Sequence, residues 1–197
     1  MSEPLSDSAL DQLFRTARTY NGYHAKPVSD VQLHAIWDLM KFGPTSANCL
    51  PARIIWCTSD AAKQKLAALA MPANAEKILA APVTAIIGMD LEFYEKLPEL
   101  FPHADARSWF VGNDELTKAT AFRNSSLQGA YFILAARALG LDTGPMSGFN
   151  NDAVDGEFFA DQPGVKSNFI STLGYGDPAT IFERSPRPDF GRFNRIA

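Results

Sequence analysis

The longest regular pattern in the sequence, residues 115–141, predicts a single long helix. Its apolar residues are closely spaced and lie around most of the helix: Leu127, Ala130, Tyr131, Leu134, Ala135, Ala138 and Leu139. A helix that is apolar around most of its circumference is buried. In a chain of 197 residues, such a helix belongs either at the centre of the core or at an interface between two subunits.

The flanking segments predict an α+β fold, in which helices wrap around a sheet. Short apolar runs at 53–58 and 82–89 are typical of buried strands, and VKSNFISTLG at 165–174 predicts a last central strand. Apolar residues at helical spacing predict helices at 7–18, between Ser29 and Gly43, and at 60–70. The chain contains no internal repeat or low-complexity linker, and its hydrophobic content is 46%. We therefore expect residues 1–197 to form one compact domain.

Residues 90–114 interrupt this order of elements. They carry a concentration of aromatic side chains: Phe93, Tyr94, Phe101, Trp109 and Phe110. That aromatic content argues against disorder. Long connections within compact domains are commonly functional. The segment is therefore either a lid over a binding site or a helical excursion that caps the core, and the sequence leaves both open.

Charge and composition exclude several classes of partner. The net charge of −4 and the pI of about 5.3 make nucleic-acid binding unexpected. No apolar run approaches the roughly 20 residues of a membrane-spanning helix, and the acidic, polar start lacks an apolar signal core. The two cysteines, Cys49 and Cys57, form no disulfide framework and are expected to be reduced. These features predict a cytoplasmic protein.

The familiar catalytic motifs are absent from the sequence. It has no phosphate-binding Walker loop, no GxGxxG after a strand and no GxSxG nucleophile turn. The three histidines, His24, His34 and His103, do not have the spacing of a zinc site. We therefore expect no metal, no Rossmann dinucleotide site and no serine hydrolase chemistry.

Arginines cluster near both ends of the chain. FRTARTY contains Arg15, Thr16 and Arg18, and ERSPRPDFGR contains Arg184, Arg187 and Arg192. Arginines beside hydroxyl groups predict a phosphate site, because a guanidinium group can donate two parallel hydrogen bonds to phosphate oxygens. Solvated surface charge remains the alternative interpretation.

Two further segments have the composition of ligand-binding loops. Between Pro44 and Pro51 lie Thr45, Ser46 and Asn48, which are small and polar. Residues 139–149, LGLDTGPMSGF, form a predicted loop in which glycines let backbone N–H groups approach a flat ligand. An ordinary turn between a helix and a strand remains possible there. Together with the arginines, these segments predict a ligand with a phosphate tail and a flat, polar head.

The segments RTARTY, PTSANCLPAR, LGLDTGPMSGF and GYGDPA…RSPR, in this order, resemble the FMN-dependent nitroreductase superfamily over nearly the whole chain. The sequences PTSANCLPAR and DTGPMSGF resemble the corresponding segments of its RutE/HadB branch, the malonic semialdehyde reductases of uracil degradation. The resemblance implies a nitroreductase-like central sheet wrapped by helices. It also implies a homodimer with the long helix at the interface and two FMN sites, each built from both subunits.

The resemblance also assigns candidate FMN contacts. It implies that the phosphate and the ribityl chain are bound by Arg15, Thr16 and Arg18, with further phosphate contacts from Arg184 and Arg187. The facing subunit would contribute Thr45, Ser46 and Asn48. The loop facing the isoalloxazine ring would consist of Thr143, Gly144, Pro145, Met146, Ser147 and Gly148. The C-terminal arginines reach such a site only if the tail folds back over the dimer. The sequence departs from the family pattern at Phe14, where many members have arginine, and at 49–52, where many have Gln-Pro-Trp after the asparagine.

The resemblance implies a ping-pong NAD(P)H oxidoreductase, in which a hydride passes to flavin N5 and then to an acceptor bound in the same place. The predicted reaction is reduction of malonic semialdehyde to 3-hydroxypropionate in pyrimidine degradation. Arg53, Arg107 and Arg123 are unranked candidates for binding a substrate carboxylate. The alternatives are a broad-specificity nitroreductase, quinone reductase or flavin reductase, and a non-catalytic FMN-binding module. No sequence feature identifies the proton donor or the preferred nicotinamide.

Overall fold

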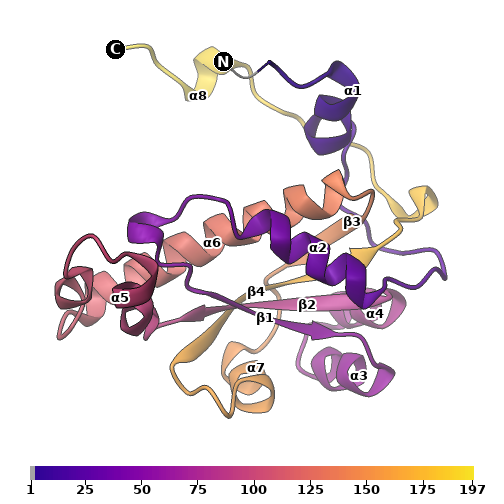
Figure 1. Cartoon of the computed structure of the whole chain (residues 1–197). Coiled ribbons are helices and arrows are strands. Elements are labelled where there is room, and N and C mark those ends of the chain that lie inside the picture. Colours follow the sequence, from indigo (N-terminus) through magenta and orange to yellow (C-terminus); the bar gives the residue numbers. More distant parts are fainter. Residues whose placement is uncertain (1–2) are drawn as a thin grey trace.

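The computed structural model describes residues 3–197 and contains one four-stranded antiparallel sheet (Figure 1). The strands are β1 (Ala52–Cys57), β2 (Val83–Asp90), β3 (Asp142–Met146) and β4 (Val165–Gly174), in the order β1-β2-β4-β3. The two central strands, β2 and β4, pair in register from Val83 opposite Leu173 to Asp90 opposite Val165, with an irregularity at Ile87/Gly88. The predicted α+β class is confirmed.

Helices cover both faces of the sheet (Figure 1). The helices of residues 3–197 are α1 (Asp7–Leu10), α2 (Asp30–Met40), α3 (Asp60–Ala68), α4 (Pro72–Ala80), α5 (Leu97–Leu100), α6 (Asp114–Ala138), α7 (Asn151–Phe158) and α8 (Phe190–Phe193). Those on the sheet are α2 and α6 on one face and α3, α4 and α7 on the other. Short turns complete the secondary structure: a π-helical turn η1 (Asp11–Arg15) and the 3₁₀ turns η2 (Ser46–Asn48), η3 (Phe93–Lys96), η4 (Ala106–Trp109) and η5 (Pro178–Thr180). Among residues 3–197, no helix is long and apolar enough to cross a membrane.

The alternation of side chains along β2 divides the core into two layers. Val83, Ala85 and Ile87 face α2 and α6, where they pack with Phe132. Ile86 points to the opposite face, into a cluster that α3, α4 and α7 complete with Leu66, Ile78 and Val154. Successive residues of a strand point to opposite faces, so a run of apolar residues predicts burial on both sides. The three predicted strands are confirmed to within one residue at each end.

Helix α6 differs from the prediction in the distribution of its polar residues. The predicted helix was apolar around most of its circumference, but the buried face contains a series of polar residues: Thr117, Thr120, Asn124, Ser125 and Gln128. Large apolar side chains lie exposed on the helix, at 41% for Leu116, 55% for Phe122 and 41% for Leu127. The helix ends at Ala138, before the left-handed Gly140, whose φ is +74°.

Several local predictions were incomplete. The predicted helix at 7–18 is shorter and continues from α1 into the π-helical turn η1, which ends at Arg15. Helices α4 and α7 were not predicted. The loop expected at 139–149 contains β3, which pairs with β4 from Asp142 opposite Gly174 to Met146 opposite Ile170. Strand β3 lies at the sheet edge, where proline is tolerated, so Pro145 does not prevent pairing.

Residues 90–114 fold into short helical turns around a third apolar cluster. The cluster contains Cys49, Phe93, Leu97, Ala106, Phe110 and Ala121. The rings of Phe93 and Phe110 meet edge to face, 4.9 Å apart, and are therefore core residues. Trp109 is 51% exposed. The aromatic content of this segment thus serves partly to anchor it to the body of the protein.

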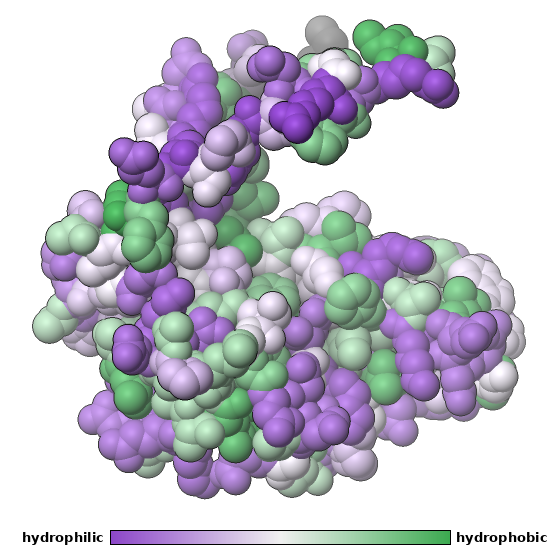
Figure 2. Space-filling view, turned by 180° about the vertical axis from the view of Figure 1, so that it is seen from behind, coloured by the Kyte–Doolittle hydropathy of each residue, from purple (hydrophilic) through white to green (hydrophobic). Residues whose placement is uncertain are grey.

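The two termini form an arm that projects from the body (Figure 1). It consists of residues 3–18 and 181–197, and Figure 2 shows an open hollow between the arm and the body. The Arg184 guanidinium joins the N-terminal and C-terminal segments of the arm by donating a hydrogen bond to the carbonyl of Ala17 at 3.0 Å. Large apolar side chains of the C-terminal part are exposed: Phe182, Phe190, Phe193 and Ile196.

Candidate functional site

Predicted arginines from the two termini meet at the base of the arm. Arg18 donates to the carbonyl of Phe182, and Arg184 donates to the carbonyl of Ala17. Arg18, Arg184 and Arg187 all line a pocket of about 380 Å³. The structure therefore gathers cationic groups separated by more than 160 positions in the sequence into one place. A pocket with several guanidinium groups is suited to bind a phosphate group.

Arg137 is a fourth guanidinium in this pocket, and the sequence interpretation missed it. Its Nη1 donates to the carbonyl of Leu13 at 2.8 Å, whereas its buried Nε has no hydrogen-bond partner among residues 3–197. Burial lowers the pKa of this guanidinium, and Asp142 partly opposes the shift. An arginine in the last turn of a helix commonly interacts with the helix dipole, so its position carried no functional signal.

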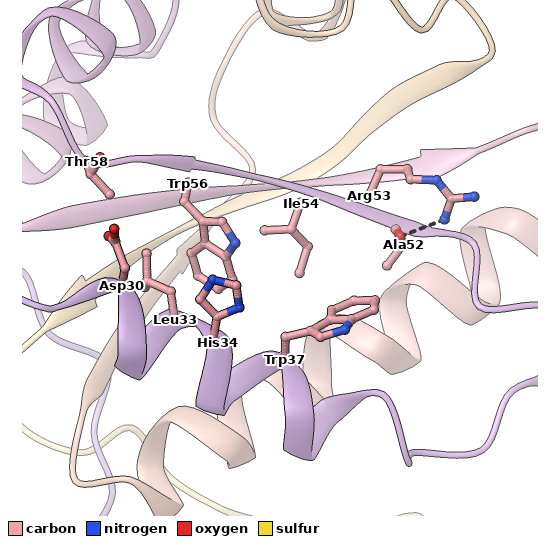
Figure 3. A pocket seen from close by; sticks show the side chains of 9 residues that line it. All are labelled: Asp30, Leu33, His34, Trp37, Ala52, Arg53, Ile54, Trp56 and Thr58. Atoms are coloured by element: carbon pink, nitrogen blue, oxygen red, sulfur yellow. Dashed lines mark hydrogen bonds between the residues drawn. The ribbon is translucent and has the colours of Figure 1, made fainter.

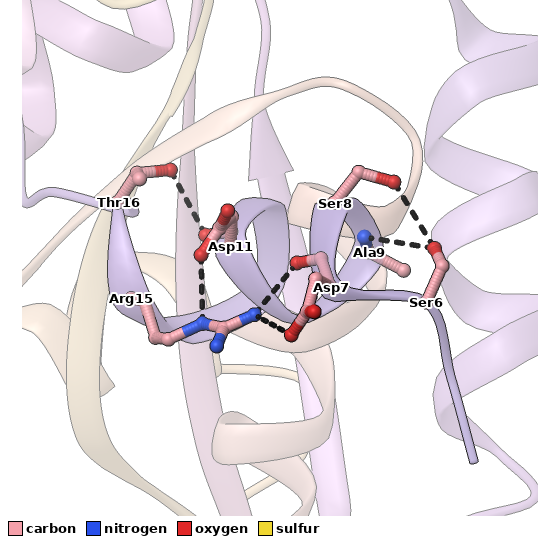
Figure 4. Close-up of polar contacts among 7 residues, drawn as sticks. All are labelled: Ser6, Asp7, Ser8, Ala9, Asp11, Arg15 and Thr16. Atoms are coloured by element: carbon pink, nitrogen blue, oxygen red, sulfur yellow. Dashed lines mark hydrogen bonds and ion pairs between the residues drawn. The ribbon is translucent and has the colours of Figure 1, made fainter.

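Arg15 and Thr16 do not line this pocket. The Arg15 guanidinium forms ion pairs of 2.7 Å with the carboxylates of Asp7 and Asp11 (Figure 4). The hydroxyl of Thr16 donates to the carbonyl of Asp11 at 2.9 Å. Arg15 and Asp11 are about half exposed and Asp7 is exposed, and such pairs contribute about 0–1 kcal/mol, so a phosphate group can compete with them.

The second predicted loop lies directly beside the first arginine segment. The backbone N–H of Tyr20 donates to the carbonyl of Thr143 at 3.2 Å, and Thr19 pairs with Thr143 in a parallel bridge. The sequence RTARTY is therefore adjacent to the start of β3. Two of the predicted binding elements, far apart in the sequence, are neighbours in the fold.

Thr143 and Gly144 belong to the sheet and not to a ligand-facing loop. The Thr143 side chain is fully buried. A Cβ atom on Gly144 would lie 2.4 Å from Thr172 Oγ1 and 2.7 Å from the carbonyl oxygen of Tyr20. The glycine therefore permits close packing between β4 and the N-terminal segment. The prediction of a loop over these residues is wrong, because pairing with β4 converts them into an edge strand.

The chain leaves β3 after Met146, and Ser147 and Gly148 then pack against the start of α4. The carbonyl of Gly148 accepts from the backbone N–H of Met71 and from Asn74 Nδ2, both at 3.0 Å. In this region, Pro145 and Ser147 are exposed, while Met146 and Gly148 are half-buried. After Arg137, Asn74 is the second candidate site residue that the sequence interpretation missed. A single asparagine within an alanine-rich helix belongs to no recognisable binding motif.

The segment 44–52 has the most unusual backbone in the described chain. Within residues 3–197, only Ala47, Asn48 and Leu50 are non-glycine residues with left-handed φ, at 48°, 50° and 38°. A left-handed conformation costs an L-residue about 1–2 kcal/mol. Such strain persists only where surrounding contacts enforce it, and it is concentrated at binding and catalytic sites. The predicted ligand-binding segment is thus also the strained one.

The side chains of this segment have different surroundings. Asn48 Nδ2 donates to the carbonyl of Leu100 at 2.8 Å, which ties the segment to residues 90–114. Thr45 Oγ1 accepts from the N–H of Leu50 at 3.2 Å. Ser46 is exposed. Burial raises the pKa of the Cys49 thiol to about 11, so this cysteine is an inert packing residue at neutral pH.

The three arginines considered for a substrate carboxylate occupy separate environments. Arg53 forms a 2.5 Å ion pair with Asp90 and also donates to the carbonyls of Leu50 and Ala52. Arg107 forms two hydrogen bonds with Glu95, at 2.7 and 2.8 Å. Arg123 is exposed on α6, and no ion pair joins it to the described residues.

A cavity larger than the arginine pocket lies elsewhere, between α2 and the edge strand β1 (Figure 3). Its volume is about 670 Å³, and aromatic side chains from both elements, including Trp37 and Trp56, line it. The guanidinium of Arg53 points away from the other side chains of the cavity (Figure 3). None of the residues assigned to FMN from the sequence lines this cavity. Its size alone is therefore no reason to place the cofactor there.

Comparison with known proteins finds similar sequences along the chain. The model of the "Nitroreductase family" matches residues 14–176. A protein of Burkholderia lata, named "Putative NADH dehydrogenase/NAD(P)H nitroreductase", is 62% identical over 192 residues, which cover 98% of each chain. A protein with the same name from Polynucleobacter asymbioticus is 57% identical over 196 residues and the full length of both chains.

Solved structures show the same fold. A structure from Exiguobacterium sibiricum, described as a "putative nitroreductase in complex with FMN", has a TM-score of 0.86 and 18% identity over the full length of both chains. An enone reductase of gut-bacterial fatty acid metabolism, CLA-ER, has a TM-score of 0.85 and 14% identity, covering 98% of this chain and 99% of its own. The nitroreductase-like fold expected from the sequence is confirmed. Since the family model matches residues 14–176 and the relatives match along almost the entire chain, the protein belongs to the nitroreductase family.

Proposed function

We propose that the protein is an FMN-dependent NAD(P)H oxidoreductase whose residues 1–197 form one catalytic domain per subunit. The observation that carries the proposal is the pocket of four arginines beside β3, in a member of the nitroreductase family. The unpartnered Nε of Arg137 fits a bound phosphate oxygen. FMN, when bound, would supply the hydride chemistry at its N5 atom.

The chain's residues would bind and orient this cofactor. Arg18, Arg184 and Arg187 would hold the phosphate, joined by Arg15 once it leaves its carboxylate partners. The exposed Ser147 and the adjacent Gly148 would lie beside the ring system. Asn74 would keep this turn in place through its hydrogen bond to the Gly148 carbonyl.

The segment 44–52 would complete the site from a second subunit. Asn124, which binds this segment, and Arg137 are 13 positions apart on α6, or about 20 Å at 1.5 Å per residue. Figure 1 shows the segment near the α5 end of the molecule and the arm at the other end of α6. A homodimer would bring Thr45, Ser46 and Asn48 of one chain to the arginine pocket of the other. Exposed apolar residues on α6 and on the arm are suited to such an interface.

We further propose malonic semialdehyde as the acceptor, reduced to 3-hydroxypropionate, as in the RutE/HadB branch of uracil degradation. Arg123 is the favoured partner for the substrate carboxylate, because a substrate bound by Arg53 or Arg107 would first have to displace the carboxylate of Asp90 or Glu95. Replacement of Arg123 by glutamine should then raise KM for the semialdehyde and leave KM for a neutral nitroaromatic unchanged. Arg107→Gln is the matched control, and an equal effect of both variants would remove this role.

A broad-specificity NAD(P)H nitroreductase is the second candidate, favoured by the names of the similar proteins. Residues 90–114 would border the acceptor site through the exposed Trp109. Trp109→Ala should therefore change the relative kcat/KM of different acceptors. Unchanged ratios would leave the segment a purely structural role.

The deciding experiment begins with the absorption spectrum of the purified protein and the mass of the released chromophore. The proposal predicts FMN at about one per chain, followed by NAD(P)H oxidation with an acceptor. A higher kcat/KM for malonic semialdehyde than for nitroaromatics would establish the narrower function, and the reverse would favour the broader one. FMN binding without turnover would indicate a non-catalytic module. A protein that FMN cannot reconstitute would refute the flavoenzyme proposal.

A further inference from the structure

Three side chains of α6 bind the backbone of the strained segment 44–52. Asn124 Oδ1 accepts from the N–H of Ser46 at 2.8 Å. Gln128 Oε1 accepts from the N–H of Ala52, also at 2.8 Å. The Tyr131 hydroxyl donates to the carbonyl of Pro44 at 2.9 Å. The helix therefore contacts the segment near its beginning, at its turn and at its end.

The spacing of these side chains shows why one helix can make all three contacts. Positions 124, 128 and 131 follow i, i+4 and i+7 spacing and lie on one face of α6. Segment 44–52 runs along this face. Gly43 is also required here, because a Cβ atom on it would lie 2.1 Å from the Tyr131 ring. The contact between helix and segment is thus close as well as polar.

The burial of the two amides indicates that they are retained for their hydrogen bonds. Asn124 is 1% exposed and Gln128 is fully buried. Asn124 Nδ2 donates to the carbonyl of Thr120, whereas Gln128 Nε2 has no partner among residues 3–197. An unsatisfied buried donor costs about 1–3 kcal/mol. Because an apolar side chain would avoid that cost, the acceptor that Gln128 offers to Ala52 is its evident contribution.

These contacts hold a backbone that would otherwise relax. Ala47, Asn48 and Leu50 are left-handed, and all three lie between the two N–H groups that the amides fix. The N–H groups of Thr45 and Ala47 form no hydrogen bond within the described part of the chain. Asn124, Gln128 and Tyr131, together called the clamp here, therefore fix the conformation without using the N–H groups of Thr45 and Ala47.

We propose that Asn124 and Gln128 are positioning residues, with Tyr131 as their third member, and that they hold segment 44–52 in its ligand-binding conformation before FMN arrives. The part concerning FMN rests on the proposed function. Rigid presentation of a binding segment increases affinity because less conformational freedom is lost on binding. None of the three residues needs to touch the cofactor for this role.

The test compares Asn124→Leu and Gln128→Leu with the control Asn168→Leu in the full-length, FMN-stripped protein. Asn168 is a half-buried amide that bonds to Ser125 and Ser126 of α6 but not to the segment. Amide hydrogen exchange at Ser46 and Ala52 should accelerate about tenfold or more in the first two variants, with a roughly tenfold weaker Kd for FMN. The control should change neither, even if it lowers Tm.

A milder variant covers the possibility that the leucine variants fail to fold. Tyr131→Phe removes only the hydroxyl and should accelerate exchange in the segment and weaken FMN binding by a smaller factor. Unchanged exchange at Ser46 in Asn124→Leu, or in Tyr131→Phe if only that variant folds, would refute the clamp. Faster exchange with the Kd of wild type would refute the positioning role. Failure of the wild type to bind FMN would instead refute the proposed function and the FMN part of this inference, whereas exchange would still report the clamp.

Discussion

Replacement of Gly129 by alanine tests how closely α6 packs on the sheet. In an exposed helix, this substitution stabilises by about 0.8–1 kcal/mol, because alanine has the higher helix propensity. Here the added Cβ atom would lie 2.4 Å from both Cε1 and Cζ of Phe169 on β4. Overpacking of a core typically costs about 1–3 kcal/mol. The two effects together predict a net destabilisation of up to about 2 kcal/mol.

Urea unfolding of a small set of variants measures this balance. Gly129→Ala should lower the unfolding midpoint in the wild-type background. In a Phe169→Leu background, the ring atoms are absent, and the same substitution should become neutral or stabilising. Ala130→Gly, at an exposed neighbouring position, is the matched control and should destabilise by about 1 kcal/mol through helix propensity alone. Stabilisation by Gly129→Ala in the wild-type background would refute the packing argument.

Further predictions concern the arginine pocket, the clamped segment and pH. Arg184→Gln should weaken FMN binding about 10–100-fold, whereas Arg192→Gln, outside the pocket, should not; equal Kd values would remove Arg184 from the site. Arg53→Met should lower the free energy of unfolding by about 1–3 kcal/mol in urea titrations, because Asp90 and two carbonyls lose their donor, and a change within error would show that water replaces it. Burial raises the pKa of Asp142 above its usual 3.8, so the folded state binds the proton of this carboxyl group more tightly than the unfolded state does. The contribution of Asp142 to the free energy of unfolding therefore falls as the pH rises from below 3.8 through the folded-state pKa. Asp142→Asn should therefore reduce the loss of Tm over this acidic range, and an unchanged profile would assign the loss to other groups.

Local sequence signals identified the elements whose structure depends mainly on their own residues. Ser29 begins α2 as predicted, with a capping box in which its hydroxyl accepts from the N–H of Gln32 and the Gln32 side chain accepts from the N–H of Ser29. Strand β4 has the predicted bounds, Val165–Gly174, and is a central strand as predicted. The family is also evident from short motifs, and the model match over residues 14–176 confirms it.

Other features depend on partners that are distant in the sequence. Pro145 and its glycine neighbours indicated a loop. Residues 142–146 form a strand instead, because they pair with β4. Arg15 is a local exception: it belongs to the predicted phosphate motif, yet the carboxylates of Asp7 and Asp11, close to it in the sequence, bind it in this structure. The polar residues on α6 did not indicate from the sequence that they are buried and bind the backbone. An asparagine or glutamine in a helix is equally compatible with a position exposed to solvent.

The sequence by itself thus determined the fold class, the central strands and the segments from which a site could be built. Periodicity and capping are local properties, and the motifs keep their order along the chain. Only the tertiary structure decided which groups meet: Arg137 with the terminal arginines, and Asn124 and Gln128 with the backbone of segment 44–52. The physical reason is that a hydrogen bond to a backbone group depends on the position of the partner's main chain and hardly on the identity of its side chain.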